Sequence, residues 1–174
     1  KKGKKDLGYQ GDDTGDEISD KNCYYSELTG LYWVAANCPD VDIKGTCHYR
    51  RYLINEQGKA YTAKEIEGIL ESHDIMTTKT LTLRSAYYDG FGANHNRKDL
   101  DLTGEILKKE FPDYYPVFEK LVHENHTYFG NMIICKRELF DAYVKWLFDI
   151  FFRMEPLMDF TGYDDYHKRV FGFI

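Results

Sequence analysis

The sequence has few of the residues that mark disulfide-rich, membrane-spanning or zinc-binding proteins. Its 174 residues include four cysteines, with no CxxC pair and no ligand-like spacing to the six histidines, which argues against a disulfide framework or a zinc site. No stretch approaches the roughly 20 apolar residues of a transmembrane helix, and the N-terminus lacks the apolar core of a signal peptide. We therefore expect reduced, mostly buried thiols and a cytoplasmic protein.

Positive charge is also scarce, because 23 Lys and Arg face 29 Asp and Glu and give a formal net charge of −6. This balance provides no general attraction to nucleic acid or anionic lipid, so a polyanion would have to bind in a local pocket. Aromatic residues, by contrast, are abundant, with 15 Tyr and 11 Phe in a chain that is 43% hydrophobic. Such a composition indicates one folded domain with a real core.

The order of the expected elements predicts an α/β layer fold. Helices are indicated by apolar residues at spacings of three and four, by the capping-box spacing of Thr62 and Glu65, and by Pro112 at the start of a helix. Asn22 is expected to cap the first helix. Strands are indicated by β-favouring runs. The expected helices cover 23–36, the residues after Thr62, both sides of Pro112 and 136–158; the strands lie within 42–53, 74–83 and 126–136; the Gly-containing segment 87–96 is expected to be a loop.

The stretch "GTCHYRRYL" (45–53) concentrates charge at the end of a short strand. Guanidinium groups such as those of Arg50 and Arg51 donate paired hydrogen bonds to phosphate oxygens. Ligands of open α/β sheets lie beyond the carboxyl ends of strands, where these residues and His48 are expected. A structural ion pair is the other interpretation, since adjacent strand residues point to opposite faces and only one Arg would face a cleft. The residues alone leave both open.

Three other stretches could bind a ligand, and each has a plain structural interpretation. The acidic loop 12–22 is either a solvated loop or the edge of a cleft that holds a ribose or sugar. The segment around His95 could close over a substrate, or simply turn into the next helix. Asn131, within an apolar strand, must satisfy its amide through backbone groups or a ligand hydroxyl. The hydroxyl-binding candidates in the acidic loop are Asp12, Asp13, Ser19 and Asn22.

The most specific stretches are "ELTGLYW" (27–33) and "HYRRY" (48–52). Together with "DDTGDEISDKN", "HNRKDLDL", "GNMIICKRELFDAYVKWLFDI" and "YDDYHKRVFGF", they resemble in order and spacing the domain of unknown function found in bacterial capsular polysaccharide and lipopolysaccharide glycosyltransferases. The likeness covers nearly the whole chain. Members of that family usually begin with one further strand and continue past "GF" into another helix. We therefore expect residues 1–174 to be a single glycosyltransferase-like domain that is truncated at both ends.

The resemblance implies a nucleotide-diphospho-sugar-dependent glycosyltransferase with a Rossmann-like, GT-A type fold. In such folds an Asp-x-Asp motif holds a divalent metal, Mn²⁺ or Mg²⁺, on the diphosphate, and here "HYRRY" stands at that place without the paired acids. His48, Arg50 and Arg51 would then stabilise the leaving diphosphate in place of a metal or beside one. The candidates for a catalytic base are Asp164, Asp165 and Glu27, and the expected sugar or acceptor contacts are Trp33, His95 and Asn131.

The partners that follow from the resemblance are a nucleotide sugar and a saccharide or lipid-linked saccharide acceptor, without nucleic acid, at the inner face of the cell membrane. Two other function classes stay open. A non-catalytic carbohydrate-binding module would use Tyr and Trp ring faces and polar side chains for sugar. A metal-dependent hydrolase would use Asp12, Asp13 and His48.

Overall fold

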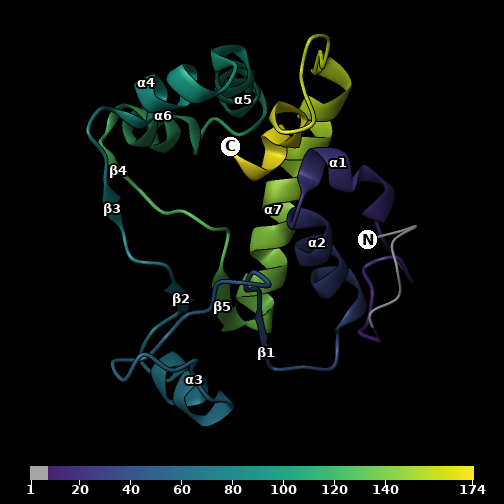
Figure 1. Cartoon of the computed structure of the whole chain (residues 1–174), viewed down its shortest axis with the longest axis vertical. Helices are drawn as coiled ribbons and strands as arrows, with labels where there is room; N and C mark the ends of the chain where they lie inside the picture. Colours follow the sequence, from purple (N-terminus) through teal and green to yellow (C-terminus); the bar gives the residue numbers. More distant parts are fainter. Residues whose placement is uncertain (1–7) are drawn as a thin grey trace.

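The protein is built around one long helix, α7 (Arg137–Met154), which runs through the centre of Figure 1. The computed structural model describes residues 8–174. Helix α7 packs against α2 (Leu28–Asn37) and, elsewhere along its length, against α5 (Arg97–Glu110). The other helices are α1 (Asn22–Tyr25), α3 (Ala63–Leu70), α4 (Tyr87–Asn94) and α6 (Tyr115–His123), and the short 3-10 helices are η1 (Ser19–Lys21), η2 (Glu155–Leu157) and η3 (His167–Gly172).

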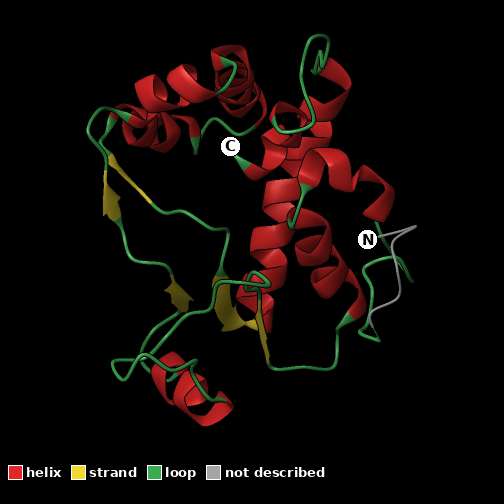
Figure 2. Ribbon diagram, in the orientation of Figure 1, coloured by secondary structure: helices red, strands yellow, loops and turns green. Residues whose placement is uncertain are grey.

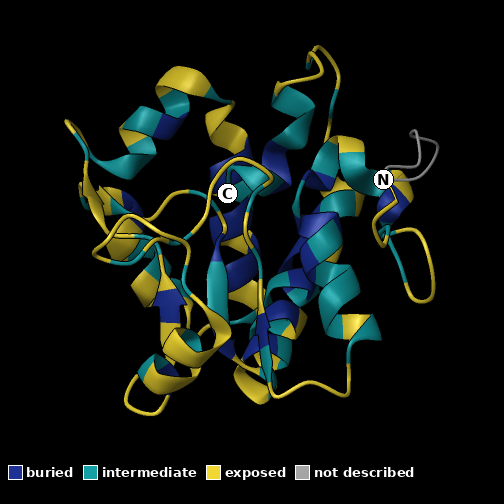
Figure 3. Cartoon of the chain, turned by 60° about the horizontal axis from the view of Figure 1, so that its bottom comes forward, coloured by how far each residue is buried: buried dark blue, intermediate teal, exposed yellow. Residues whose placement is uncertain are grey.

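The apolar stripe of α7 supplies the centre of the core. Phe140, Val144, Phe148 and Phe151 are each no more than 3% exposed, and their spacing is the three-and-four pattern that the sequence predicts for 136–158. Figure 3 shows the buried residues concentrated along α7 and the elements beside it. The predicted helix is therefore confirmed. It ends at Met154, shortly before Pro156, whose ring is incompatible with a helix interior.

The main sheet has three short strands in the order β1 (Ile43–Gly45), β5 (Ile133–Lys136) and β2 (Ile75–Thr77). Both β1 and β2 run antiparallel to β5, so their carboxyl ends lie together beside the start of β5. A Cβ at Gly45 would lie 2.8 Å from Ile134 Cγ1, so glycine permits this close approach. Strands β3 (Leu81–Thr82) and β4 (His126–Thr127) form a separate ladder, apart from the main sheet in Figure 2.

The α/β class is confirmed, but the Rossmann-like arrangement does not describe this sheet. Rossmann-like sheets are built from parallel neighbours. Within residues 8–174 every pair of bonded strands is antiparallel. The strands β1 and β2 nevertheless point the same way on either side of β5, so the predicted position of a ligand beyond their carboxyl ends is retained.

Two local predictions at the start of the chain were wrong. The helix expected over 23–36 is broken at Ser26, which has a φ of 51°, and Asn22 begins α1 instead of capping it. The strand expected within 42–53 ends at Gly45, and His48 and Arg51 form a tight antiparallel bridge instead. In both places tertiary contacts, described below, determine the backbone.

Two further predictions failed in the middle of the chain. The segment 87–96, expected to be a loop, contains α4, whose glycines are tolerated because Phe91 anchors the helix at 4% exposure. The strand expected over 126–136 is divided into β4 and β5, and Asn131 between them has a φ of 47°. The capping box of Thr62 and Glu65 and the break between two helices at Pro112 are confirmed, but the second helix begins only at Tyr115, so Pro116 and not Pro112 lies in its first turn.

The four cysteines are free thiols, but the expectation that most are buried was wrong. Only Cys135, in the central strand, is buried, whereas Cys23 and Cys47 are exposed. Burial and then the nearby Asp141 raise the pKa of Cys135 to about 11. No helix in residues 8–174 is long and apolar enough to cross a membrane.

The packing of α7 predicts that Phe140 contributes more to the free energy of unfolding than its neighbour Leu139. Phe140→Ala removes a ring that is 0% exposed, and we expect it to lower the free energy of unfolding by about 3–5 kcal/mol. Leu139→Ala is the control, because Leu139 is 38% exposed and should cost less than about 1 kcal/mol. Urea unfolding followed by circular dichroism measures both. Equal losses would show that α7 does not pack as described.

Candidate functional site

A pocket of about 250 Å³ opens between the start of α2 and the segment that follows β1. It lies at the carboxyl end of β1, beside the residues that lead into β5. Three of the predicted site residues, Glu27, His48 and Asn131, line it. The remaining lining residues are Leu28, Gly30, Leu31 and Val34 from α2 and Gly45, Thr46 and Cys47 after β1.

The carboxylate of Glu27 is the polar centre of this pocket. Asn131 Nδ2 donates to Glu27 Oε1 at 3.0 Å, and His48 Nε2 lies 3.8 Å from the same oxygen. On the other carboxylate oxygen, Arg169 Nη2 lies 3.9 Å from Oε2. The Glu27 side chain keeps 31% of its surface exposed. The site is therefore an oriented, solvent-accessible carboxylate that is contacted by groups from three other parts of the chain.

Glu27 owes its position to an unusual backbone conformation at Ser26. Ser26 combines a φ of 51° with a ψ of −127°, a combination costly for any residue other than glycine. Arg169 Nε donates to Ser26 Oγ at 2.6 Å, and Asn22 Nδ2 donates to the Ser26 carbonyl at 2.7 Å. These bonds hold the turn between α1 and α2 and aim Glu27 into the pocket.

The acidic loop 12–22 is hydrogen-bonded to the first turn of α2, next to Ser26 and Glu27. Asp12 accepts hydrogen bonds from Ser19 Oγ at 2.9 Å and from Thr29 Oγ1 at 2.6 Å, and Asn22 Nδ2 donates to Thr29 Oγ1 at 3.0 Å. Three residues expected to bind the donor, Asp12, Ser19 and Asn22, thus contact one another and the first turn of α2. Asp13 is exposed at the tip of this loop.

The charged stretch after β1 forms a tight turn at the mouth of the pocket. His48 and Arg51 exchange backbone hydrogen bonds of 3.1 and 3.2 Å, which place Tyr49 and Arg50 at the tip. Both arginines are exposed. Within residues 8–174 neither guanidinium forms an ion pair or a side-chain hydrogen bond, so the alternative of a structural ion pair is not observed there. The Arg50 guanidinium lies 4.7 Å from the ring centre of Tyr49.

His48 joins this turn to the segment before β5. Its Nε2 contacts the carbonyl oxygen of Gly130, and because a carbonyl only accepts, Nε2 carries the proton of that bond. The other ring nitrogen, Nδ1, can donate to a ligand only when the ring is protonated on both nitrogens.

The sequence predicts Asn131 within an apolar strand, but the residue lies before β5. Its amide nitrogen donates hydrogen bonds to protein groups. Its Nδ2 donates to Glu27 Oε1 and, at 3.2 Å, to the carbonyl of Gly172 in η3. The residue is exposed and left-handed, which asparagine tolerates better than most residues. Asn131 therefore connects the C-terminal segment to the catalytic candidate Glu27.

The other predicted acids lie in a separate cluster. Asp164 Oδ1 accepts from His167 Nδ1 at 2.8 Å, and His167 Nε2 contacts the Asn94 carbonyl at 3.1 Å. The amide and ring N–H groups of His167 lower the pKa of Asp164, and Asp164 in turn raises the pKa of His167. Asp165 is exposed, 3.8 Å from Lys168. This arrangement holds the segment 164–167 against α4.

His95 and Trp33, both expected to contact sugar, pack against protein groups outside the lining of the Glu27 pocket. The His95 ring stacks on Phe173 at 4.3 Å, and burial followed by the charge of His167 lowers its pKa. Trp33 Nε1 donates to the Thr14 carbonyl at 2.7 Å and holds the N-terminal loop on α2.

The described residues do not form a metal centre with three or more protein ligands. No three His, Cys, Asp or Glu side chains of residues 8–174 gather where they could hold an ion, so Asp12, Asp13 and His48 do not form the group expected of a hydrolase. Asp-x-Asp spacing occurs at 40–42, directly before β1, and at 99–101 within α5, where the two acids accept hydrogen bonds from different tyrosine hydroxyls.

Comparison with known proteins places the chain in a family. A family model described as a domain of unknown function, DUF4422, matches residues 1–174. The chain belongs to the DUF4422 family. No curated protein matches the sequence. Among solved structures, the apo form of the bifunctional glycosyltransferase WbbM is similar, with a TM-score of 0.83 and 28% identity over 92% of this chain.

The DUF4422 chain spans only 33% of the WbbM chain that it matches. The likeness therefore supports a relation to glycosyltransferases for a mixed α/β domain of this shape. The resemblance inferred from the sequence is confirmed at that level. The likeness gives no information on the donor or acceptor of this chain.

Sequence reasoning missed Arg169 and Ser26. Arg169 lies in the stretch "YDDYHKRVFGF", which the resemblance included but which gave no reason to single out this residue. Ser26 carries no signal, because an ordinary serine inside an apolar helical pattern does not indicate a positive φ. Both act through contacts between residues more than 140 positions apart in sequence.

The pair of Asp164 and His167 predicts a pH dependence. Because the pKa of His167 is raised and that of Asp164 lowered in the folded state, the pair stabilises the fold between about pH 3.8 and 6.5. Its contribution is lost as the pH rises through the raised pKa of His167.

Asp164→Asn should bring the His167 pKa back towards about 6.5, measured by an NMR titration of the imidazole carbons. Asp165→Asn is the matched control and should leave that pKa unchanged. If both variants titrate like the wild type, the contact is not formed in solution.

Proposed function

We propose that this DUF4422 domain is a nucleotide-diphospho-sugar-dependent glycosyltransferase. The observation that carries the proposal is a pocket lined by an oriented carboxylate, Glu27, and by His48, the first residue of the exposed basic turn His48–Arg51. A carboxylate suits proton abstraction from a hydroxyl, and a basic turn suits a departing diphosphate. The likeness to WbbM supports the same reaction class.

The donor diphosphate would bind at the turn. Arg50 and Arg51 are exposed and, within residues 8–174, their guanidinium groups have no acidic partner. Each therefore can offer paired N–H donors to phosphate oxygens. His48 would contribute through Nδ1 when its ring carries both protons. These cations stabilise the negative charge that develops as the diphosphate leaves.

The acceptor would bind beside Glu27. In a transfer that inverts the anomeric configuration, Glu27 takes the proton from the acceptor hydroxyl as that oxygen attacks the anomeric carbon. The bond from this carbon to the diphosphate oxygen breaks, and its electron pair leaves with the diphosphate. Asn131 and Arg169 keep the Glu27 carboxylate oriented through the step.

The acceptor class that we propose is a saccharide or lipid-linked saccharide of capsule or lipopolysaccharide synthesis, at the inner face of the membrane. The family resemblance supports it. A carbohydrate-binding module, the other class that suits this aromatic-rich chain, needs sugar contacts but no diphosphate site, so nucleotide binding separates the two.

Nucleotide binding tests the donor site. We expect UDP, UDP-glucose or UDP-galactose to bind in calorimetric titration, and Arg50→Ala or Arg51→Ala to weaken the affinity about tenfold or more, because each removes charge-assisted hydrogen bonds. Arg84→Ala is the matched control, since Arg84 is equally exposed but follows β3. It should change the affinity less than twofold.

Two results would contradict the donor site. Nucleotide affinity that is equal in wild type, Arg50→Ala and Arg51→Ala would place the diphosphate elsewhere. Binding of oligosaccharides without any binding of UDP, GDP or CMP derivatives would favour the carbohydrate-binding module.

Glu27→Gln tests the base. The amide side chain would keep the shape of the glutamate and could still accept from Asn131, but it cannot take a proton, so kcat should fall about 10²- to 10⁴-fold while nucleotide affinity is retained. Nucleotide release from the donor that binds, with a panel of saccharide acceptors, measures the rate. Glu56→Gln, on an exposed turn of the same connection between β1 and α3, is the control. Full activity in Glu27→Gln would show that another group is the base.

A further inference from the structure

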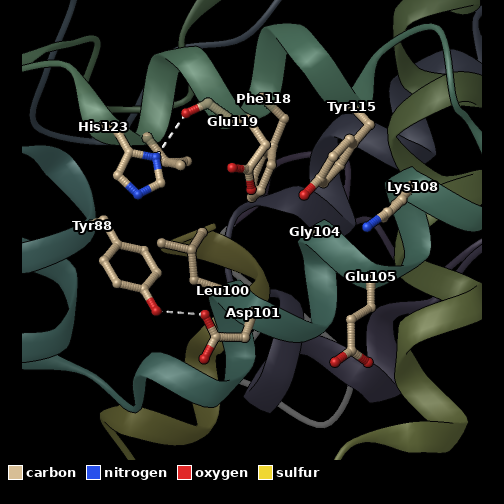
Figure 4. A pocket seen from close by; sticks show the side chains of 11 residues that line it. Tyr88, Leu100, Asp101, Gly104, Glu105, Lys108, Tyr115, Phe118, Glu119 and His123 are labelled. Atoms are coloured by element: carbon tan, nitrogen blue, oxygen red, sulfur yellow. Dashed lines mark hydrogen bonds between the residues drawn. The ribbon is translucent and has the colours of Figure 1, made fainter.

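A second pocket, of about 210 Å³, lies between α4, α5 and α6 (Figure 4). It shares no lining residue with the pocket around Glu27. Neither the sequence nor the proposed transfer reaction gives it a role. Its lining residues are Tyr88 from α4; Leu100, Asp101, Gly104, Glu105 and Lys108 from α5; and Tyr115, Phe118, Glu119, Val122 and His123 from α6.

The floor of this pocket is apolar and closely packed. Leu100 and Val122 are 2% and 7% exposed. Gly104 lets α5 and α6 approach closely, since a Cβ there would lie 3.1 Å from the Phe118 ring. Two tyrosine rings, Tyr88 and Tyr115, stand on opposite sides of the opening in Figure 4. The pocket thus offers aromatic surface on two sides.

The polar groups at the rim are oriented by one another. The Tyr88 hydroxyl donates to Asp101 Oδ1 at 2.7 Å, and the Tyr88 ring stacks on His123 with centres 5.4 Å apart. His123 Nδ1 donates to the Glu119 carbonyl at 2.8 Å, which leaves Nε2 as an acceptor in the neutral ring. Lys108 Nζ lies 5.5 Å from the centre of the Tyr115 ring.

The charge of the lining determines what can bind. Three carboxylates, those of Asp101, Glu105 and Glu119, face one lysine, Lys108, so the pocket repels phosphate and is unsuited to a nucleotide sugar. These acids do not converge on a single point, since no three His, Cys, Asp or Glu of residues 8–174 could hold one ion. Acceptors that are spread over the lining suit several hydroxyl donors better than one cation.

We propose that this pocket binds an uncharged pyranose unit of a saccharide. The apolar C–H face of the ring packs on the aromatic and aliphatic side chains, and its hydroxyls donate to the carboxylates at the rim. Such a subsite holds one sugar of a longer chain away from the position where transfer is proposed. Because the two pockets share no residue, the proposal stands whether or not the chain transfers sugar.

Titration of the whole chain with maltose, lactose and cellobiose tests this proposal, followed by saturation-transfer NMR and calorimetry. We expect at least one disaccharide to bind. Asp101→Asn and Tyr115→Ala should each weaken that affinity about tenfold or more, because they remove a charged acceptor and a stacking face. Tyr115→Phe keeps the ring and should retain the affinity. Asp149→Asn and Tyr9→Ala, at exposed positions outside this pocket, are matched controls and should bind like wild type.

Three outcomes would overturn the proposal. Binding of none of the three disaccharides is the first. Binding that survives Asp101→Asn and Tyr115→Ala but is lost in His48→Ala would place the sugar in the Glu27 pocket. The third outcome comes from titrating glucose and glucosamine in the same way. If glucosamine bound more tightly than glucose, the site would be one for a cation and not for an uncharged ring. Loss of nucleotide binding in Arg50→Ala concerns only the proposed transferase and leaves this test unaffected.

Discussion

The buried ring of Tyr25 joins the three segments on which the Glu27 pocket depends. It is 0% exposed, stacks on Phe171 of η3 at 4.3 Å, and donates its hydroxyl to Glu155 at 3.0 Å beyond the end of α7. Burial, and then the Glu155 carboxylate, raise the pKa of Tyr25, so the hydroxyl keeps its proton. Because Ser26 and Glu27 follow directly, this packing fixes where the strained turn and the carboxylate lie. A site that needs a carboxylate within 4 Å of groups from distant segments requires such an anchor.

A buried lysine holds the other wall of the pocket. Lys44 in β1 is 3% exposed, and its Nζ donates to Asp141 of α7 at 2.6 Å and to the Ala35 carbonyl of α2 at 3.1 Å. Removing Asp141 would leave the buried Lys44 charge without its acidic partner, which is destabilising, whereas Asp141 itself is 40% exposed. The edge strand is thereby tied to both helices, and the basic turn that follows it is carried to the start of α2.

The two pockets differ in the charge of their lining residues, and this difference underlies the two separate proposals made for them. The Glu27 pocket combines one carboxylate with an exposed basic turn, which fits a reacting centre with a diphosphate. The pocket on α4, α5 and α6 has an excess of carboxylates and two tyrosine rings, which fits hydroxyl groups and excludes phosphate. Because the linings of the two pockets differ in charge, they suit two ligands of different charge.

The sequence by itself determined the features that depend on neighbouring residues: the capping box at Thr62, the helix boundary at Pro112, the apolar stripe of α7, and the candidates Glu27, His48 and Asn131. Tertiary structure decided what these residues do together. Ser26 adopts a positive φ only because Arg169 and Asn22 hold it, and α4 forms despite two glycines because Phe91 is buried. Capping and amphipathic spacing act within a few residues and can be read from the chain. Residues 27, 48, 131 and 169 come together only when separate elements pack against one another. Such packing cannot be predicted from neighbouring residues in the sequence.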